Sequence, residues 1–139
     1  MNVQFKDYSK IVIDKMHKEA VAFLEEASGE IEHQTALNTK VDTGKTKGSW
    51  EHRVDEKTMT AEVGSRYKNA LWEELGTGIY ALNGDGRKDV PWFYKTPDGK
   101  GHLTVGKKPR RALFRAYTSL KNPIIKEARR RFKNLWQMF

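Results

Sequence analysis

One triplet in this sequence is of a kind that catalyses peptide hydrolysis, Asp42-Thr43-Gly44. In aspartic proteases two aspartates share one proton, and a homodimer of a small chain could supply both. Here, however, Lys40 and Lys45 flank the triplet, and lysines beside such a pair would hold both carboxylates ionised. The residues therefore favour a structural role, in which Asp42 caps or turns the chain and Gly44 provides the backbone angle before a hairpin.

Other catalytic and ligand-binding patterns lack their required spacing. The glycine clusters at 76–78 and 84–86 have neither the Gly-Lys-Ser/Thr ending nor the flanking strand and helix of a phosphate-binding loop. The four histidines lie far apart and no cysteine is present, so a zinc site is not indicated. Glu73 and Glu74 would point about 100° apart on a helix, so we expect one solvated carboxylate and one that holds a loop. We expect no enzymatic activity, no metal and no cofactor.

The elements that position these residues begin with a helix. Apolar residues recur at helical spacing from Phe5 to about Leu37, which predicts a helix on the order of 50 Å long. That length exceeds the body of a domain of this size, so part of the helix is free to project toward a neighbour. Gly29 is the expected weak point, because glycine inside a helix costs about 1 kcal/mol relative to alanine.

The middle of the chain predicts a hairpin followed by a short helix and a long loop. Residues 49–54 and 58–64 alternate apolar with polar side chains, as paired strands do. Tyr67, Leu71 and Leu75 then recur every four residues, and Gly76 is expected to end their helix in the left-handed conformation. The glycine-rich connection 77–101 is expected to be mobile in the isolated chain, and to order on a partner through its aromatic residues Trp92, Phe93 and Tyr94. Residues 102–105 predict another short strand.

The C-terminal arm predicts helix and carries the charge. It begins at Pro109 and restarts at Asn122-Pro123, which indicates a kinked helix or two consecutive helices. The whole chain has a net charge of +8, and residues 107–139 hold eleven basic side chains against one acid, Glu127. Such an excess favours an anionic partner, and without a DNA-reading module any nucleic-acid contact is expected to be to phosphates, weak, salt-sensitive and blind to sequence. The candidate contact residues are Lys107, Lys108, Arg110, Arg111, Arg115, Arg129, Arg130, Arg131 and Lys133.

Taken together, the patterns predict an α+β fold in a single domain spanning residues 1–139. A long N-terminal helix (1–38) and C-terminal helices (107–139) are expected to pack on a small, mainly antiparallel sheet with its loops (41–106). No apolar run approaches the roughly 20 residues that span a bilayer, and the N-terminus lacks a signal pattern. We therefore expect no membrane partner, and a soluble, intracellular protein.

Two signatures in this order resemble the head-tail joining proteins of long-tailed bacteriophages, also described as tail-completion or neck proteins. The first signature comprises Asp42, Thr43, Gly44, Ser49 and Trp50, and the second Tyr67, Glu74, Gly76 and Thr77; Pro109 with residues 111–116 matches the start of the last helix. The chain departs from the family pattern at Thr46, where an apolar residue is usual, and at Lys68-Asn69-Ala70, where alanine usually follows the tyrosine directly.

The resemblance implies a non-enzymatic structural protein of a phage or prophage, acting in virion assembly at the head-tail junction. Its partners would be other neck or tail proteins, often in a ring of identical subunits, and it would occupy the host cytoplasm during assembly and then the virion. The competing interpretation is a small basic nucleic-acid-binding protein that contacts phosphates through its C-terminal helices.

Overall fold

The computed structural model describes residues 2–42 and 44–138, and it confirms the expected α+β class. Two long helices are joined by two small antiparallel hairpins, a short helix and two single turns of 3-10 helix. In chain order the elements are α1 (Ser9–Asn38), η1 (Lys47–Ser49), β1 (Trp50–Asp55), β2 (Thr60–Ser65), α2 (Lys68–Leu75), η2 (Gly78–Tyr80), β3 (Trp92–Lys95), β4 (Gly101–Thr104) and α3 (Ala112–Gln137). The sheet is therefore two separate hairpins rather than one unit.

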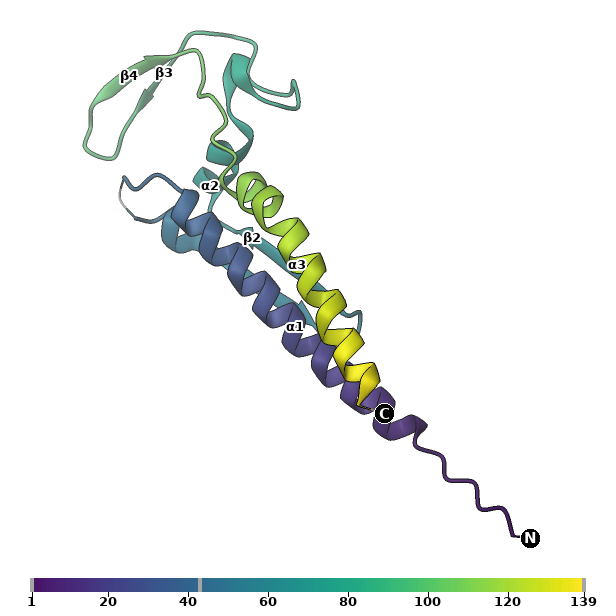
Figure 1. The fold of residues 1–139 in the computed structure, drawn as a ribbon. Coiled ribbons are helices and arrows are strands. Elements are labelled where there is room, and N and C mark those ends of the chain that lie inside the picture. Colours follow the sequence, from purple (N-terminus) through teal and green to yellow (C-terminus); the bar gives the residue numbers. More distant parts are fainter. Residues whose placement is uncertain (1, 43, 139) are drawn as a thin grey trace.

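Helices α1 and α3 pack side by side and run antiparallel (Figure 1). Arg131, near the end of α3, pairs with Glu26 of α1, while Asn38 at the end of α1 donates a hydrogen bond to the Ala112 carbonyl at the start of α3. Helix α1 begins at Ser9 rather than at the predicted Phe5, and the Asp7 carboxylate just before it accepts a hydrogen bond from the Ser9 N–H at 2.9 Å. The chain before α1 extends past the end of α3 (Figure 1).

The weak point expected at Gly29 is not a break, since α1 is continuous across it. The imidazole of His52, from β1, lies over this position, and a Cβ added to Gly29 would be 3.6 Å from His52 Cε1. At that distance a Cβ would make an ordinary van der Waals contact, so glycine is not required here. Tertiary contact offsets its cost of about 1 kcal/mol in helix propensity.

The β1–β2 hairpin lies along α1 with one face covered. Trp50, His52 and Val54 are more buried than the residues between them, which is the alternation that predicted the strand. The observed strands begin and end one or two residues later than predicted. The Asp55 carboxylate accepts hydrogen bonds from the Lys57 and Thr58 backbone N–H groups and so fixes the turn.

For the distal half, two predictions are corrected and one is confirmed. The connection 77–101 is not without structure, because Trp92–Lys95 is a strand that pairs with Gly101–Thr104. The predicted strand at 102–105 is confirmed within one residue as β4. Gly76 has a positive φ of 77° as predicted, but its ψ of 174° is extended rather than left-handed helical.

Helix α3 is one continuous helix rather than two. It passes through Pro123 without ending, and begins at Ala112 rather than at Pro109. Proline removes one backbone hydrogen bond, but packing of the flanking turns on α1 holds the helix together. None of the helices in the described part of the chain is long and apolar enough to cross a bilayer.

The buried core is small. Among the described residues, the buried hydrophobic side chains are Trp50, Ala70, Ala112 and Ala116. Three polar residues are also buried: Ser28 and Thr35 in α1, and Thr39 directly after it. Each of these hydroxyls donates to a backbone carbonyl one turn earlier, so none is left unpaired. Small side chains at these positions give little apolar burial within the single chain.

Candidate assembly surfaces

The second signature is a clamp that holds the start of α3. Both carboxylate oxygens of Glu74 accept backbone hydrogen bonds, from the N–H groups of Leu113 and Phe114, each at 2.9 Å. The residue before α3, Arg111, has φ 54° and makes no side-chain cap. Glu74 therefore supplies from α2 the acceptor that a local N-cap residue would normally provide, and its charge favours the positive end of the helix dipole.

Glu73 binds the segment that leads into α3. Its carboxylate pairs with Lys107 and with Arg110, the latter at 3.1 Å, and its backbone carbonyl accepts the Arg110 N–H at 2.7 Å. The Glu73 side chain is only 17% exposed, so the prediction that one of the two glutamates is simply solvated is wrong. Lys107 and Arg110, predicted as contacts to an anionic partner, have this internal partner instead.

The glycines of the second signature permit close backbone pairing. Thr77 N–H donates to the Lys107 carbonyl at 2.9 Å and Ile79 N–H to the Val105 carbonyl at 3.1 Å, while the Thr77 hydroxyl accepts the Lys107 N–H. A Cβ on Gly78 would overlap the Val105 carbonyl, and one on Gly106 would overlap the Thr77 carbonyl. These residues are needed for contact between chain segments, a role beyond the turn and cap chemistry predicted for them.

The first signature contributes mainly its last residues. Trp50 is buried and its indole N–H donates to the Thr39 hydroxyl at 2.9 Å, while the Ser49 hydroxyl accepts from Ser65 at 2.7 Å. Thr43 lies outside the described residues. Gly44 has φ 82°, as the predicted turn requires. Asp42 is exposed, and no hydrogen bond joins its carboxylate to the part of the chain that the structure describes; because its neighbour Thr43 lies outside that part, the cap or turn by Asp42 stays a prediction.

Tyr67 marks the start of α2. Its carbonyl accepts the Ala70 N–H at 2.9 Å, its own N–H donates to the Ser65 hydroxyl, and the residue is 41% exposed. The motif tyrosine is therefore available for contact beyond its own chain.

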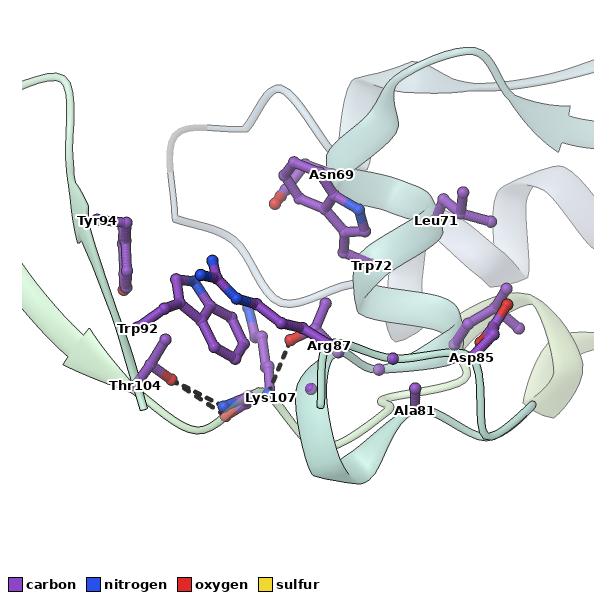
Figure 2. Close-up of a pocket in the computed structure, with 16 residues that line it drawn as sticks. Asn69, Leu71, Trp72, Ala81, Asp85, Arg87, Trp92, Tyr94, Thr104 and Lys107 are labelled. Atoms are coloured by element: carbon purple, nitrogen blue, oxygen red, sulfur yellow. Dashed lines mark hydrogen bonds between the residues drawn. The ribbon is translucent and has the colours of Figure 1, made fainter. Parts of the chain in front are cut away.

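A groove of about 730 Å³ lies between α2 and the β3–β4 hairpin. Figure 2 shows the Trp72 side chain from α2 and the Trp92 side chain from β3 lining it, with Arg87 next to Trp92. The guanidinium of Arg87 lies 5.2 Å from the Trp92 ring centroid. Tyr94 also lines the groove and stacks on His102 at 5.2 Å, whereas Phe93 points outward and is 60% exposed. The lining is mixed, because Asn69, Asp85, Arg87, Thr104 and Lys107 border the groove together with the aromatic side chains.

His52 joins the hairpin to α1 through two carboxylates. Its Nδ1 bonds Glu32, and its Nε2 lies 3.0 Å from Glu25, one turn on either side of Gly29. The hydrogen bond to Glu32, followed by the one to Glu25, raises the pKa of His52 above its ordinary value, although partial burial opposes the shift. The sequence analysis missed this cluster, although Glu25, Gly29 and Glu32 share a helix face.

The basic residues of the C-terminal arm fall into internal and outward groups. Arg131, whose side chain is 21% exposed, pairs with Glu26, Glu127 and Glu19. Arg115 donates a hydrogen bond to the Asn38 carbonyl at 3.1 Å.

Arg130 binds the Glu127 carboxylate through two of its nitrogens. These hydrogen bonds, followed by those of Arg131, lower the pKa of Glu127 to about 2. Arg111 lies 3.6 Å over the Phe114 ring and Lys108 5.7 Å from the Tyr80 ring.

Among the described residues, Lys126, Arg129 and Lys133 have no ion pair or hydrogen bond through their side chains, and all three are exposed. Of the predicted contact residues, Arg129 and Lys133 therefore have no side-chain partner within the described chain, and Lys108 and Arg111 have ring contacts only; Lys126 was not among those predicted. Across residues 2–42 and 44–138, no group of histidine and acidic side chains is placed to hold a metal ion. Comparisons with protein families, with curated proteins and with solved structures find no match to this chain.

Proposed function

We propose that this chain is a non-enzymatic structural subunit of a bacteriophage head-tail junction, whose exposed apolar surfaces are covered by neighbouring subunits. The phage assignment comes from the two sequence signatures. The subunit role is supported by the surface of the isolated chain, which is far larger than a monomer of its mass should have.

The accessible surface is 10723 Å² for a mass of 16.1 kDa. A folded monomer of this mass exposes about 7,400 Å² by the usual scaling with mass. The chain therefore exposes about 3,300 Å² more than expected. A standard protein–protein interface buries about 800 Å² on each partner, so this excess matches about four such interfaces. This comparison is the observation that carries the proposal, because a chain built to stay alone would fold back on itself.

The excess surface is apolar at both ends of the molecule. At the end where the chain begins and α3 finishes, here called the helical tip, the exposed large hydrophobic residues are Val3, Phe5, Tyr8, Ile11, Ile13, Trp136 and Met138. At the opposite end, here called the hairpin end, they are Leu71, Trp72, Ile79, Leu82, Phe93 and Leu103. Apolar surfaces of this extent mark interaction sites in soluble proteins. Exposure at two opposite ends suits contacts to two neighbours, as in a ring of head-to-tail subunits.

Deletion of the coding sequence from the phage or prophage genome that carries it tests the proposal. The expected products, seen by electron microscopy, are DNA-filled heads and finished tails that are not joined. Expression of the wild-type chain from a plasmid is expected to restore joined particles. Normal numbers of complete, infective virions in the deletion strain would rule the proposal out.

A further inference from the structure

The outward face of α3 carries a row of cations that its own chain does not neutralise. Lys126, Arg129 and Lys133 are spaced three and four residues apart, so they lie on one side of the helix. Successive residues of a helix are rotated by about 100°, so these three side chains point away from Arg131. Arg131 faces α1 and pairs with its glutamates. We call these three residues the basic stripe.

Neighbouring acids do not neutralise the basic stripe. Glu127 is the one acid in residues 107–139, and its carboxylate is occupied by Arg130 and Arg131. The same side of the helix carries Asn122 and Gln137, which are uncharged and polar, Arg115, which donates to the Asn38 carbonyl, and the exposed Trp136, seven residues after Arg129. Such a face differs from a solvated helix surface, where both signs of charge usually mix.

We propose that the basic stripe is a contact site for the phosphate backbone of nucleic acid, with duplex DNA as its ligand. The stripe rises about 10 Å along the helix. Duplex DNA presents one phosphate charge per about 1.7 Å of axis, so several phosphates lie within reach of the three side chains. Charge complementarity favours this ligand over an acidic protein patch, whose carboxylates commonly have partners of their own. The inference depends on the free cations alone and is independent of the phage assignment.

Binding of DNA by the basic stripe depends on charge and not on base sequence. Lys126 and Lys133 end in point charges on flexible stems, and neither α3 nor its surroundings form a known base-reading module. Affinity for DNA falls as the salt concentration rises. If the basic stripe neutralises three phosphates, it contributes about −2.7 to the slope of the logarithm of affinity against the logarithm of salt concentration. Between about 50 and 200 mM salt this contribution amounts to a loss of about 40-fold.

Fluorescence anisotropy of a labelled DNA duplex with the full-length chain tests the site. The variant Lys126→Gln/Arg129→Gln/Lys133→Gln removes the basic stripe. The matched control Lys18→Gln/Lys57→Gln/Lys95→Gln removes the same charge from exposed lysines on α1, the first hairpin turn and β3. We expect the stripe variant to lose about 2.7 from the magnitude of the salt slope and the control to lose less than about 1. A second duplex of unrelated sequence is expected to bind with the same affinity.

Three results would overturn the proposal. The first is no wild-type binding at about 50 mM salt, which would leave an acidic protein surface as the partner. The second is an equal loss in the stripe and control variants, which would show a response to net charge only. The third is a marked preference for one duplex sequence. Circular dichroism of all three proteins shows whether the fold is intact, and the substituted side chains are exposed, so we expect it to be unchanged.

Discussion

Neighbouring glutamates, Glu73 and Glu74, have different roles although they occupy adjacent positions in the chain. Glu74 caps the first turn of α3, and Glu73 neutralises Lys107 and Arg110 before that helix begins. The glutamate of the second signature is thereby accounted for by a structural role. These partners could not be predicted from the sequence, because the contacts join residues more than thirty positions apart.

Replacement of Glu74 by alanine is expected to lower the free energy of unfolding by about 0.5–2 kcal/mol, the usual cost of a lost N-cap. Glu56, an exposed carboxylate in the first hairpin turn, provides the control. Glu56→Ala is expected to stay within about 0.5 kcal/mol of the wild type. Urea unfolding followed by circular dichroism gives both values. Equal effects of the two substitutions would contradict the capping role.

The pairing of His52 with Glu32 and Glu25 predicts a pH-dependent stability. Because the folded-state pKa of His52 is raised, its contribution is fully present below the unfolded pKa of about 6.5 and is lost as the pH rises through the folded pKa. The stability difference between the wild type and His52→Gln is therefore expected to shrink from about pH 6 toward pH 9. Urea unfolding across this range measures it. A difference that stays constant or grows with pH would show that His52 is not held as a cation.

At the scale of elements, patterns within one segment predicted well and contacts between segments did not. The helical spacing of α1 and the alternation in β1 and β2 are local, and these elements are confirmed. Strand β3 was missed because Trp92–Lys95 is short and follows a proline and several glycines, which usually mark loops. Gly29 and Pro123 predicted interruptions, but packing against the hairpin and against α1 keeps both helices continuous.

The contact of residues 76–79 with 105–107 predicts that Gly78 cannot carry a side chain. Gly78 has φ 58°, and a Cβ there would overlap the Val105 carbonyl. We expect Gly78→Ala to cost more than about 2 kcal/mol of unfolding free energy, since strain and overlap add. Gly48 is the control, because a Cβ there meets no atom within 4 Å. Unfolding measurements that rank Gly48→Ala as the more damaging substitution would contradict the account of this contact.

The β3–β4 hairpin is expected to exchange its amide hydrogens rapidly in the isolated chain. It is a two-stranded sheet with Phe93 and Leu103 exposed, and such hairpins are marginally stable alone. Hydrogen exchange of residues 92–104 is expected to slow when a neck or tail partner is added, while exchange in the middle of α1 stays unchanged. Strong protection of the hairpin in the free chain would place the partner contact elsewhere.

At the scale of the whole molecule, a small core and a large surface belong together. The buried residues of the described chain are mostly alanine, serine and threonine, so little apolar area is fully buried within it. The larger apolar residues gather instead at the helical tip and the hairpin end, where neighbouring subunits would cover them. The proposed role at a phage head-tail junction joins this arrangement to the two sequence signatures.

The most direct test of this role is the position of the chain in a finished particle. Virions carrying an affinity tag before Val3, in the segment that extends past α3, can be labelled with gold particles and viewed by electron microscopy. The proposed function predicts gold where the tail meets the head, and nowhere along the tail tube or over the rest of the capsid. Purified virions that lack the chain, or gold spread over the capsid shell, would contradict it.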